Sequence, residues 1–310
     1  MANINWYPGH MHKAGKEMRK IIPQVDLIIE VLDARIPFSS ENPMLATIRG
    51  DKPCIKVLSK SDLADPIMTQ QWQDYLEQEK GVKTIAMTTD EPDKMRDILS
   101  LCHKMVPVKA SGDERLEAMI MGIPNVGKST LINILAGRTI AKTGNEPAVT
   151  KNQQRIKLDR GIVLLDTPGM LWPKLENKHG GYRLAITGAI KETAVSNDDI
   201  AMYAVDYFRD TYPELLKERY NLTELAEDAL PLLESIGAKR GCLRAGGRVD
   251  LDRAAKILLT EFRDITIGRM TLETPAMMEA ELIEMAEIRA AKEAKLAAKK
   301  NKRHNSRNQP

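Results

Sequence analysis

Aromatic residues are scarce in this chain of 310 residues, at 4% of its composition. This scarcity argues against recognition of single-stranded nucleic acid by base stacking, and favours shape and backbone contacts for any nucleic-acid partner. Cysteine is also rare: Cys54, Cys102 and Cys242 form no CxxC pair, so we expect buried thiols in a reducing compartment. No apolar run approaches the roughly 20 residues that span a bilayer, and nothing near Met1 resembles a signal peptide. The sequence predicts a cytoplasmic protein without membrane contact.

A strong overall charge is lacking too, because 46 Lys and Arg stand against 43 Asp and Glu, a net +3. The charge is unevenly distributed, however. Residues 289–310 carry eight basic residues and one Glu, a balance of +7, which leaves −4 for residues 1–288. Two interpretations of this basic end are equally open: an arm that neutralises phosphate, or a solubilising, disordered terminus.

Short apolar runs alternate with helix-like stretches through the first half of the chain. Five runs have the β-branched or continuously apolar character of strands buried on both faces: Val25–Leu32, Cys54–Leu58, Val82–Met87, Ala118–Met121 and Ile162–Leu165. Helical patterns lie between them at Gln70–Gln78, Lys94–Lys104 and Ser129–Ala136. This alternation predicts an α/β fold with a mostly parallel sheet.

The strand signal disappears after Trp172. Helices are expected at Tyr182–Ile190, Asp198–Asp210, Glu214–Tyr220, Leu222–Ile236, Leu251–Thr266 and Pro275–Lys300. We therefore expect three parts: an α/β domain over residues 1–174, an all-α C-terminal domain over residues 175–288, and a basic, disordered tail over residues 289–310.

One glycine-rich segment carries the most specific signal in the sequence. Residues 122–129, GIPNVGKS, fit the pattern G-x-x-x-x-G-K-[ST] and lie between a predicted strand and a predicted helix. In such a loop the backbone N–H groups surround phosphate oxygens at the positive end of the helix. We expect Lys128 to reach the β- and γ-phosphates and Ser129 to bind Mg²⁺. The other nucleotide contacts expected from this loop are Asn125, Val126, Gly127 and Thr130.

A second motif, Asp166-Thr167-Pro168-Gly169, follows the last predicted strand. Asp166 can hold Mg²⁺ through water, and Gly169 can offer its N–H to the γ-phosphate and move when that phosphate leaves. Between the two motifs, the polar loop of residues 144–150 (GNEPAVT) ends in Thr150, which we expect to add a hydroxyl to Mg²⁺. Because the second motif leads straight into the helical part, its movement is expected to shift that part.

A phosphate loop alone does not distinguish ATP from GTP, so the base-recognition motif matters. Ser59-Lys60-Ser61-Asp62 follows the strand Cys54–Leu58 and matches the guanine motif N-K-x-D, except that Ser59 replaces the asparagine. Asp62 can pair with the guanine edge, and the Lys60 stem can cover the ring. The next base-contacting loop would fall at Met87-Thr88-Thr89, where the match is poor; Met87 and Thr88 are its expected nucleotide contacts. The base motif precedes the phosphate loop, an order found in circularly permuted GTPases.

This permuted order and several local sequences resemble the RbgA/YlqF family of bacterial ribosome-assembly GTPases. The resemblance rests on WYPGHM from Trp6, SKSD before GIPNVGKS, DTPGMLWP, and KRGCLRAGGR at residues 239–248 followed by DRAA. It implies GTP and GDP as ligands with Mg²⁺, and a monomer that assists assembly of the large ribosomal subunit. It also implies a precursor of that subunit as partner and stimulator of hydrolysis. We expect RNA contacts from Lys239, Arg240, Arg244 and Arg248, and from the tail.

Catalytic help must come from an unusual place, because Met170 and Leu171 stand where many GTPases have a glutamine that orients water. His10 is one candidate, since a histidine near neutral pH can orient or deprotonate water; a surface or RNA contact is the alternative. Asn125 is another: the resemblance implies that it coordinates K⁺, and an Asx turn is the alternative. Lys128 completes the expected catalytic set through its contact with the γ-phosphate.

Three other functions remain open at this point. The missing glutamine, Ser59 and the weak second base loop also suit a nucleotide-dependent RNA-binding scaffold with little intrinsic hydrolysis. An ATPase is a second alternative, against which Asp62 speaks. A tRNA-modifying GTPase is the third, although no catalytic cysteine motif of that kind is evident.

Overall fold

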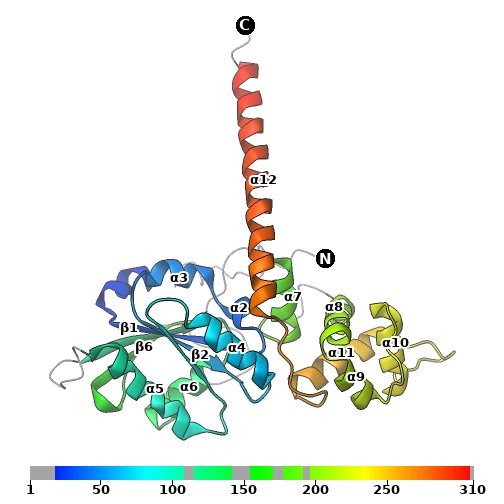
Figure 1. Ribbon diagram of the computed structural model, residues 1–310, viewed down its shortest axis with the longest axis horizontal. Helices are drawn as coiled ribbons and strands as arrows, with labels where there is room; N and C mark the ends of the chain where they lie inside the picture. The colour runs from blue at the N-terminus through cyan, green and yellow to red at the C-terminus, as the bar shows by residue number, and fades with distance from the viewer. Residues whose placement is uncertain (1–17, 108–114, 142–153, 170–176, 191–195, 308–310) are drawn as a thin grey trace.

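The computed structural model describes residues 18–107, 115–141, 154–169, 177–190 and 196–307. Side chains of residues 44–46 and 295–307 lie outside this description. An α/β body and a cluster of helices stand beside each other, and one long helix projects from between them (Figure 1). Within the described residues, no helix is both long enough and apolar enough to cross a membrane.

Six strands form one sheet in the order β3-β2-β1-β4-β6-β5. The five strands β1 (Leu27–Asp33), β2 (Cys54–Ser59), β3 (Val82–Ala86), β4 (Leu116–Gly122) and β6 (Ile162–Asp166) are parallel. The edge strand β5 (Gln154–Lys157) pairs antiparallel with β6. The chain moves outward from β1 to β3 and then returns to the other side of β1 with β4. Parallel sheets bind ligands at the carboxyl edge of such a reversal, so the β1–β4 boundary is the expected ligand position.

Alternate residues of β1 explain how the two faces of the sheet are covered. Leu27, Ile29 and Val31 pack with α5 (Pro92–Met105) and α6 (Lys128–Ala136). On the other face, Leu32 packs with Trp72 of α4 (Pro66–Leu76) and with Met278. Strands covered on both sides are apolar throughout, which accounts for the continuous apolar runs in the sequence.

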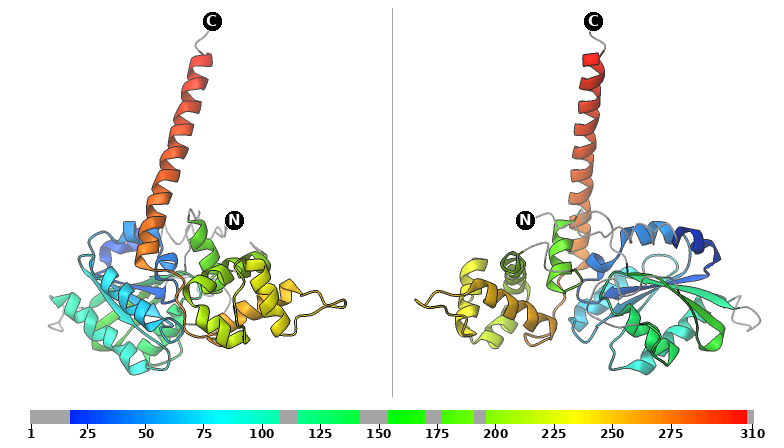
Figure 2. Two further views of the ribbon diagram at one scale, coloured as in Figure 1. Left: turned by 45° about the vertical axis from the view of Figure 1, so that its right-hand side comes forward. Right: turned by 180° about the vertical axis from the view of Figure 1, so that it is seen from behind.

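The helical region, which we define as α7 to α11, follows the sheet. It comprises α7 (Lys178–Ile186), α8 (Asn197–Thr211), α9 (Pro213–Tyr220), α10 (Ala229–Lys239) and α11 (Leu251–Arg263). Helix α11 is amphipathic: Ala254, Leu258 and Phe262 are buried, and the opposite side faces solvent. Figure 2 shows α8, α10 and α11 packed side by side, consistent with their mutual contacts.

A cluster of buried charges joins the base of the last helix, α12 (Pro275–Arg307), to both other parts. Arg183 of α7 donates to Glu281 of α12 at 2.6 Å and to Glu273 at 3.3 Å. Glu273 also accepts from the Ser39 hydroxyl of α2 (Pro37–Ser40) at 2.6 Å. Burial raises the pKa of Glu273, while the Arg183 guanidinium opposes this effect. The cluster fixes α7 and α12 against the sheet.

The structure differs from the sequence prediction at several elements. The short helices α2 and α3 (Pro43–Arg49) and the edge strand β5 were not expected. The segment 222–228 is not helical, because α10 begins only at Ala229. Helix α12 continues to Arg307 and so runs through most of the segment predicted to be disordered. Its richness in Ala, Glu and Lys explains this, since these residues have high intrinsic helix propensity.

Candidate nucleotide site

The phosphate loop and the DTPG segment approach each other closely at the carboxyl edge of the sheet. The loop follows β4, and Gly127, with φ of +91°, immediately precedes α6. A Cβ atom on Gly122 would lie 2.7 Å from the Val31 carbonyl oxygen, and one on Gly169 would lie 3.1 Å from the Pro124 nitrogen. Only glycine fits these two positions without a shift of backbone. The DTPG segment therefore lies directly against the phosphate loop, at Pro124.

Lys128 and Asp166 meet where these two motifs adjoin. The Lys128 ammonium donates to Asp166 Oδ1, and both side chains are buried. Burial lowers the pKa of Lys128, and the Asp166 carboxylate counters that shift. Asp166 Oδ2 is buried and has no hydrogen-bond partner within the described part of the chain. An orphaned carboxylate oxygen beside the start of α6, which carries Ser129, suits a hard cation such as Mg²⁺.

A cavity of about 200 Å³ lies between the base motif and the phosphate loop. Its lining brings together six residues predicted to bind the nucleotide: Ser59, Lys60, Asp62, Met87, Gly127 and Thr130. Within the predicted loop Met87-Thr88-Thr89, it is Thr89 and not Thr88 that accompanies Met87 in the lining, and the Thr88 hydroxyl accepts from the Asp90 N–H. A carboxylate in a cavity at the switch point can recognise paired N–H donors of a base edge.

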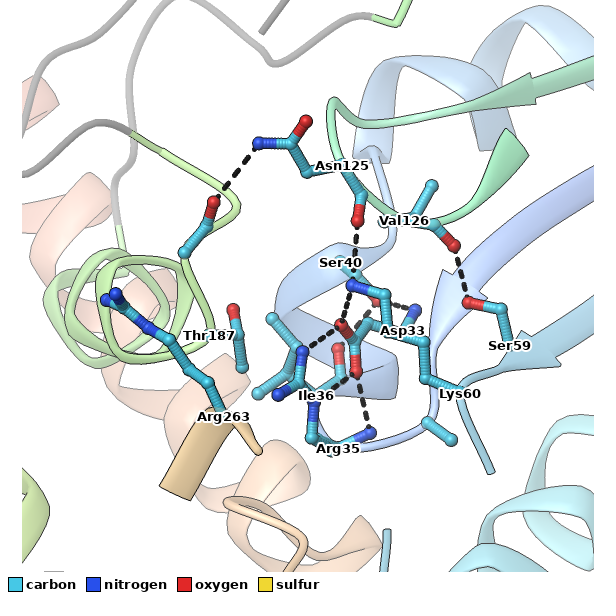
Figure 3. Close-up of polar contacts among 12 residues, drawn as sticks. Asp33, Arg35, Ile36, Ser40, Ser59, Lys60, Asn125, Val126, Thr187 and Arg263 are labelled. Atoms are coloured by element: carbon cyan, nitrogen blue, oxygen red, sulfur yellow. Dashed lines mark hydrogen bonds and ion pairs between the residues drawn. The ribbon is translucent and has the colours of Figure 1, made fainter. Parts of the chain in front are cut away.

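Ser59 has a clear structural role in this site. Its hydroxyl lies 2.5 Å from the Val126 carbonyl oxygen (Figure 3) and 2.8 Å from the Leu32 carbonyl oxygen. It therefore ties the end of β2 to the phosphate loop and to β1. The longer side chain of an asparagine would not place one polar atom against both carbonyls. The serine at position 59 of the guanine motif therefore connects the base motif directly to the phosphate loop.

Asp33, at the end of β1, organises the base motif although the sequence analysis did not select it. It accepts from Arg35 Nε at 3.0 Å and Nη2 at 2.8 Å, and from Lys60 Nζ at 2.9 Å. Burial favours the neutral form, but the Arg35 and Lys60 charges hold the pKa of Asp33 well below its usual range. Lys60 Nζ also donates to the Asn125 carbonyl at 2.7 Å. The Lys60 ammonium thus joins the base motif to the phosphate loop.

Asn125 connects the phosphate loop to the helical region. Its backbone is left-handed, with φ of +62°, and its Nδ2 donates to the Gly188 carbonyl at 3.2 Å (Figure 3). Gly188 directly follows α7 and its C-cap residue Thr187. This contact was not foreseen from the sequence, because Gly188 belongs to no nucleotide-binding motif. Two further predicted residues, His10 and Thr150, lie outside the described residues, as do Met170 and Leu171.

The predicted RNA-contacting cluster separates in space. Arg244 pairs with Asp250 at 2.9 Å in a short hairpin closed by a bridge between Leu243 and Val249. Arg240 instead faces a groove of about 440 Å³, which we call the basic groove. Its charged lining consists of Arg219, Arg240, Arg253, Lys256, Glu261 and Asp264. Three of these cations were missed by sequence reasoning, although Arg253, Lys256 and the exposed Thr260 share the helical spacing of one face of α11.

Comparisons with known proteins agree with this geometry. A family model described as a 50S ribosome-binding GTPase matches residues 117–236, which begin in β4 and leave out the base motif. Ribosome biogenesis GTPase A from Priestia megaterium is 47% identical over 287 residues, which cover 90% of this chain and 99% of that protein. The protein of the same name from Thermotoga maritima is 30% identical and is covered over 95% of its length.

Solved structures show the same architecture. A GDP-bound structure of YlqF from T. maritima has a TM-score of 0.60 at 27% identity and covers 84% of this chain and 99% of that one. The GNP-bound YlqF from T. maritima has a TM-score of 0.59 at 27% identity and covers 85% and 98%. With its permuted motifs assembled at the carboxyl edge of one sheet, this chain is a GTPase and belongs to the ribosome biogenesis GTPase A family.

Proposed function

We propose that this chain hydrolyses GTP in the cytoplasm to assist late assembly of the large ribosomal subunit, and that the ribosomal particle stimulates its turnover. The observation that carries the proposal is that one helix, α11, lines the basic groove and also packs its Phe262 ring against Arg35, whose partner Asp33 accepts from Lys60 of the base motif. A partner that occupies the groove therefore has a short physical route to the nucleotide. Relatives named ribosome biogenesis GTPase A support the assignment of that partner to the ribosome.

In this proposal each loop residue has a defined task. Asp62 pairs with the guanine edge, Lys60 covers the base, and Lys128 leaves Asp166 to contact the β- and γ-phosphates. Ser129, Asp166 and Thr150 would hold Mg²⁺, and Asn125 would hold K⁺; these ions would supply positive charge that stabilises the phosphates. His10 orients the attacking water or accepts its proton. Gly169 contacts the γ-phosphate.

The basic groove suits the phosphates of folded RNA better than a small apolar ligand. Arginine guanidiniums can contact phosphate oxygens in pairs, and its named cations outnumber its two carboxylates. Its lining contains no aromatic side chain among the described residues, so base stacking is not provided for. Lys239 at the end of α10, and Arg244 and Arg248 in the hairpin that follows, lie outside the groove lining and are proposed as separate RNA contacts.

GTP turnover measured with and without large-subunit particles, in K⁺ and in Na⁺, tests the proposed activity. We expect slow turnover of the protein alone and a large increase with the particle in K⁺. Turnover that does not respond to the particle would favour the alternative, a nucleotide-dependent RNA-binding scaffold with little hydrolysis. His10→Ala is expected to lower the stimulated rate and to leave nucleotide affinity unchanged.

Sedimentation with ribosomal particles tests the groove separately from hydrolysis. We expect the double variant Arg240→Ala, Arg253→Ala to sediment less with the particle than the wild type in the presence of a GTP analogue. A matched control, Arg209→Ala with Lys217→Ala, removes two cations of the same region that pair locally with Asp206 and Glu214. Equal losses from both double variants would show that total charge, not the groove, determines binding.

A further inference from the structure

The helical region sets the direction of a side chain in the phosphate loop. Asn125 Nδ2 donates to the Gly188 carbonyl, and a carbonyl can only accept a hydrogen bond. The nitrogen end of the amide must therefore face Gly188, and Oδ1 must face away from it. The orientation of the Asn125 amide is thus set in part by a residue outside the α/β body.

Arg263, the last residue of α11, holds the turn that carries this carbonyl. Its Nε donates to the Ile186 carbonyl at 2.8 Å and its Nη2 to the Ala185 carbonyl at 2.9 Å. These are carbonyls at the C-terminal end of α7, where a cation also interacts favourably with the helix dipole. A Cβ atom on Gly188 would lie 3.5 Å from Arg263 Nε, so the guanidinium lies directly against this glycine. Figure 3 shows Arg263 beside Thr187 at this turn.

The residue before Arg263 reaches the base motif by a second route. The Phe262 ring is buried, and the Arg35 guanidinium carbon lies 5.5 Å from its centroid. Arg35 holds Asp33, Asp33 holds Lys60, and Lys60 donates to the Asn125 carbonyl. The contacts therefore form a closed circuit that leaves the phosphate loop at the Asn125 side chain and returns at the Asn125 backbone. The end of α11 is the part of this circuit that belongs to the helical region.

We propose that Arg263 is a positioning residue of the nucleotide site, which acts through the Gly188 carbonyl on the Asn125 side chain. With Arg263 in place, the turn after α7 is fixed and the Asn125 amide has one orientation towards the nucleotide. Without it, the turn loses its two hydrogen bonds from Arg263 and the Gly188 carbonyl becomes a less precise acceptor for Asn125, so the loop is correctly arranged for a smaller part of the time. The proposal concerns hydrolysis itself, and so does not depend on the identity of the ribosomal partner.

A consequence is that α11 links the nucleotide loops to the basic groove in both directions. Arg253 and Lys256 line the groove. They lie on the same helix whose last residue, Arg263, donates to two carbonyls just before Gly188. A ligand that shifts α11 changes the Asn125 orientation, and by thermodynamic reciprocity a nucleotide that prefers one orientation changes affinity at the groove. This route differs from the one expected from the sequence, in which the DTPG segment itself moves the helical part.

A double-mutant cycle on the full-length protein, without any particle, tests the proposal. The variants are Arg263→Ala, Asn125→Gly and the double variant; glycine is chosen because it accepts the positive φ of Asn125. We expect Arg263→Ala to lower kcat about tenfold, the lower range for residues that orient a contacting group, with a smaller change in KM. In the Asn125→Gly background, the same change should alter kcat by less than about twofold, because the side chain through which Arg263 acts is gone.

Arg209→Ala is the matched control, since it removes an arginine of the helical region whose described contacts are to Asp206, Asp210 and Glu227. A second measurement is amide hydrogen exchange, which should accelerate over residues 123–127 in Arg263→Ala and not in the control. If Arg263→Ala fails to fold, Arg263→Lys, which retains the charge and loses the two-carbonyl contact, takes its place. Two results would overturn the proposal. One is an equal fall of kcat when Arg263→Ala is made in the wild-type and in the Asn125→Gly protein; the other is an unchanged kcat when it is made in the wild-type protein.

Discussion

Two carboxylates in this molecule each sit between two cations, and their surroundings are very different. Asp33 lies between Arg35 and Lys60 in the nucleotide site, and its side chain and that of Arg35 are each only 2% exposed. Glu261 lies between Arg219 and Arg240 in the basic groove. Its carboxylate is buried, but the two arginines are 27% and 39% exposed. The Asp33 cluster is therefore enclosed on its Arg35 side and exposed only at Lys60, which is 28% exposed, whereas both cations of the Glu261 cluster reach solvent.

The difference shows what each cluster can do. Around Asp33, Arg35 and Lys60 both donate to the carboxylate, and Lys60 also donates to the Asn125 carbonyl. These bonds fix the loops of the nucleotide site relative to one another. Around Glu261, the buried carboxylate accepts from the guanidiniums of Arg219 and Arg240, and both arginine side chains remain partly exposed to solvent. A buried anion that orders partly exposed arginines reduces the conformational freedom that they must lose when they bind phosphate. The Asp33 cluster stabilises the nucleotide site, and in the proposed function the Glu261 cluster orients two arginines for contact with phosphate.

The largest effect is expected from Asp33→Asn. The substitution leaves the buried Arg35 guanidinium without its counter-charge, and removal of one partner from a buried pair typically costs about 3–5 kcal/mol. It also frees Lys60 from one of its two partners, so GDP affinity should fall as well. Urea unfolding monitored by circular dichroism gives the free energy, and fluorescent GDP gives the affinity. A loss below about 1 kcal/mol would contradict the view that this cluster is enclosed.

The pH dependence of that loss provides an internal control. The pKa of Asp33 is held below its usual value by Arg35 and Lys60 against the effect of burial. A carboxyl with a depressed pKa contributes stability above its unfolded pKa of about 3.9, and loses that contribution as pH falls through the folded pKa. The difference in unfolding free energy between the wild type and Asp33→Asn should therefore be full at pH 7 and should shrink below pH 4.

A smaller effect is expected from Glu261→Gln. Burial raises the pKa of Glu261, but the hydrogen bonds from Arg219 and the nearby arginine charges lower it overall. Because both arginines retain access to water, the loss of unfolding free energy should be about 1 kcal/mol. Binding to large-subunit particles should weaken although the net positive charge has increased. Tighter binding of this variant would show that charge matters more than the orientation of the arginines.

The elements that the sequence predicted well carry their signal locally. The strands before both phosphate motifs are continuous apolar runs, and the order SKSD before GIPNVGKS is visible without any structure. The edge strand Gln154–Lys157 was missed because only Ile156 of its four residues is buried. The predicted helix Leu222–Ile236 began too early. Its apolar spacing continues back through residues 222–228, which form bends, and the helix itself begins at Ala229.

The contacts missing from the sequence prediction depend on distant pairs. Asp33 meets Lys60 because β1 and β2 are in register at Asp33 and Ser59, which no local pattern encodes. Arg263 and the Ile186 carbonyl are 77 residues apart. Arg219 and Arg253 lie on different helices, so the groove appears only when α9 and α11 pack. In contrast, Asp33 could have been suspected, since a carboxylate at the carboxyl end of a buried strand lies at the edge where α/β sheets bind ligands.

The smallest expected effect, Arg253→Ala, tests whether the open cluster truly meets phosphate. Arg253 is exposed on α11 and lines the groove, so its loss should cost little stability. If its guanidinium contacts one phosphate, its removal weakens particle binding at low salt and lowers the slope of log affinity against log salt by about 1. Binding is measured by sedimentation from 50 to 200 mM KCl, with Lys217→Ala as the control for a cation outside the groove. An unchanged slope would show that Arg253 does not contact phosphate. Asp33→Asn should leave the slope unaltered, because Asp33 lies in the nucleotide site and not in the basic groove.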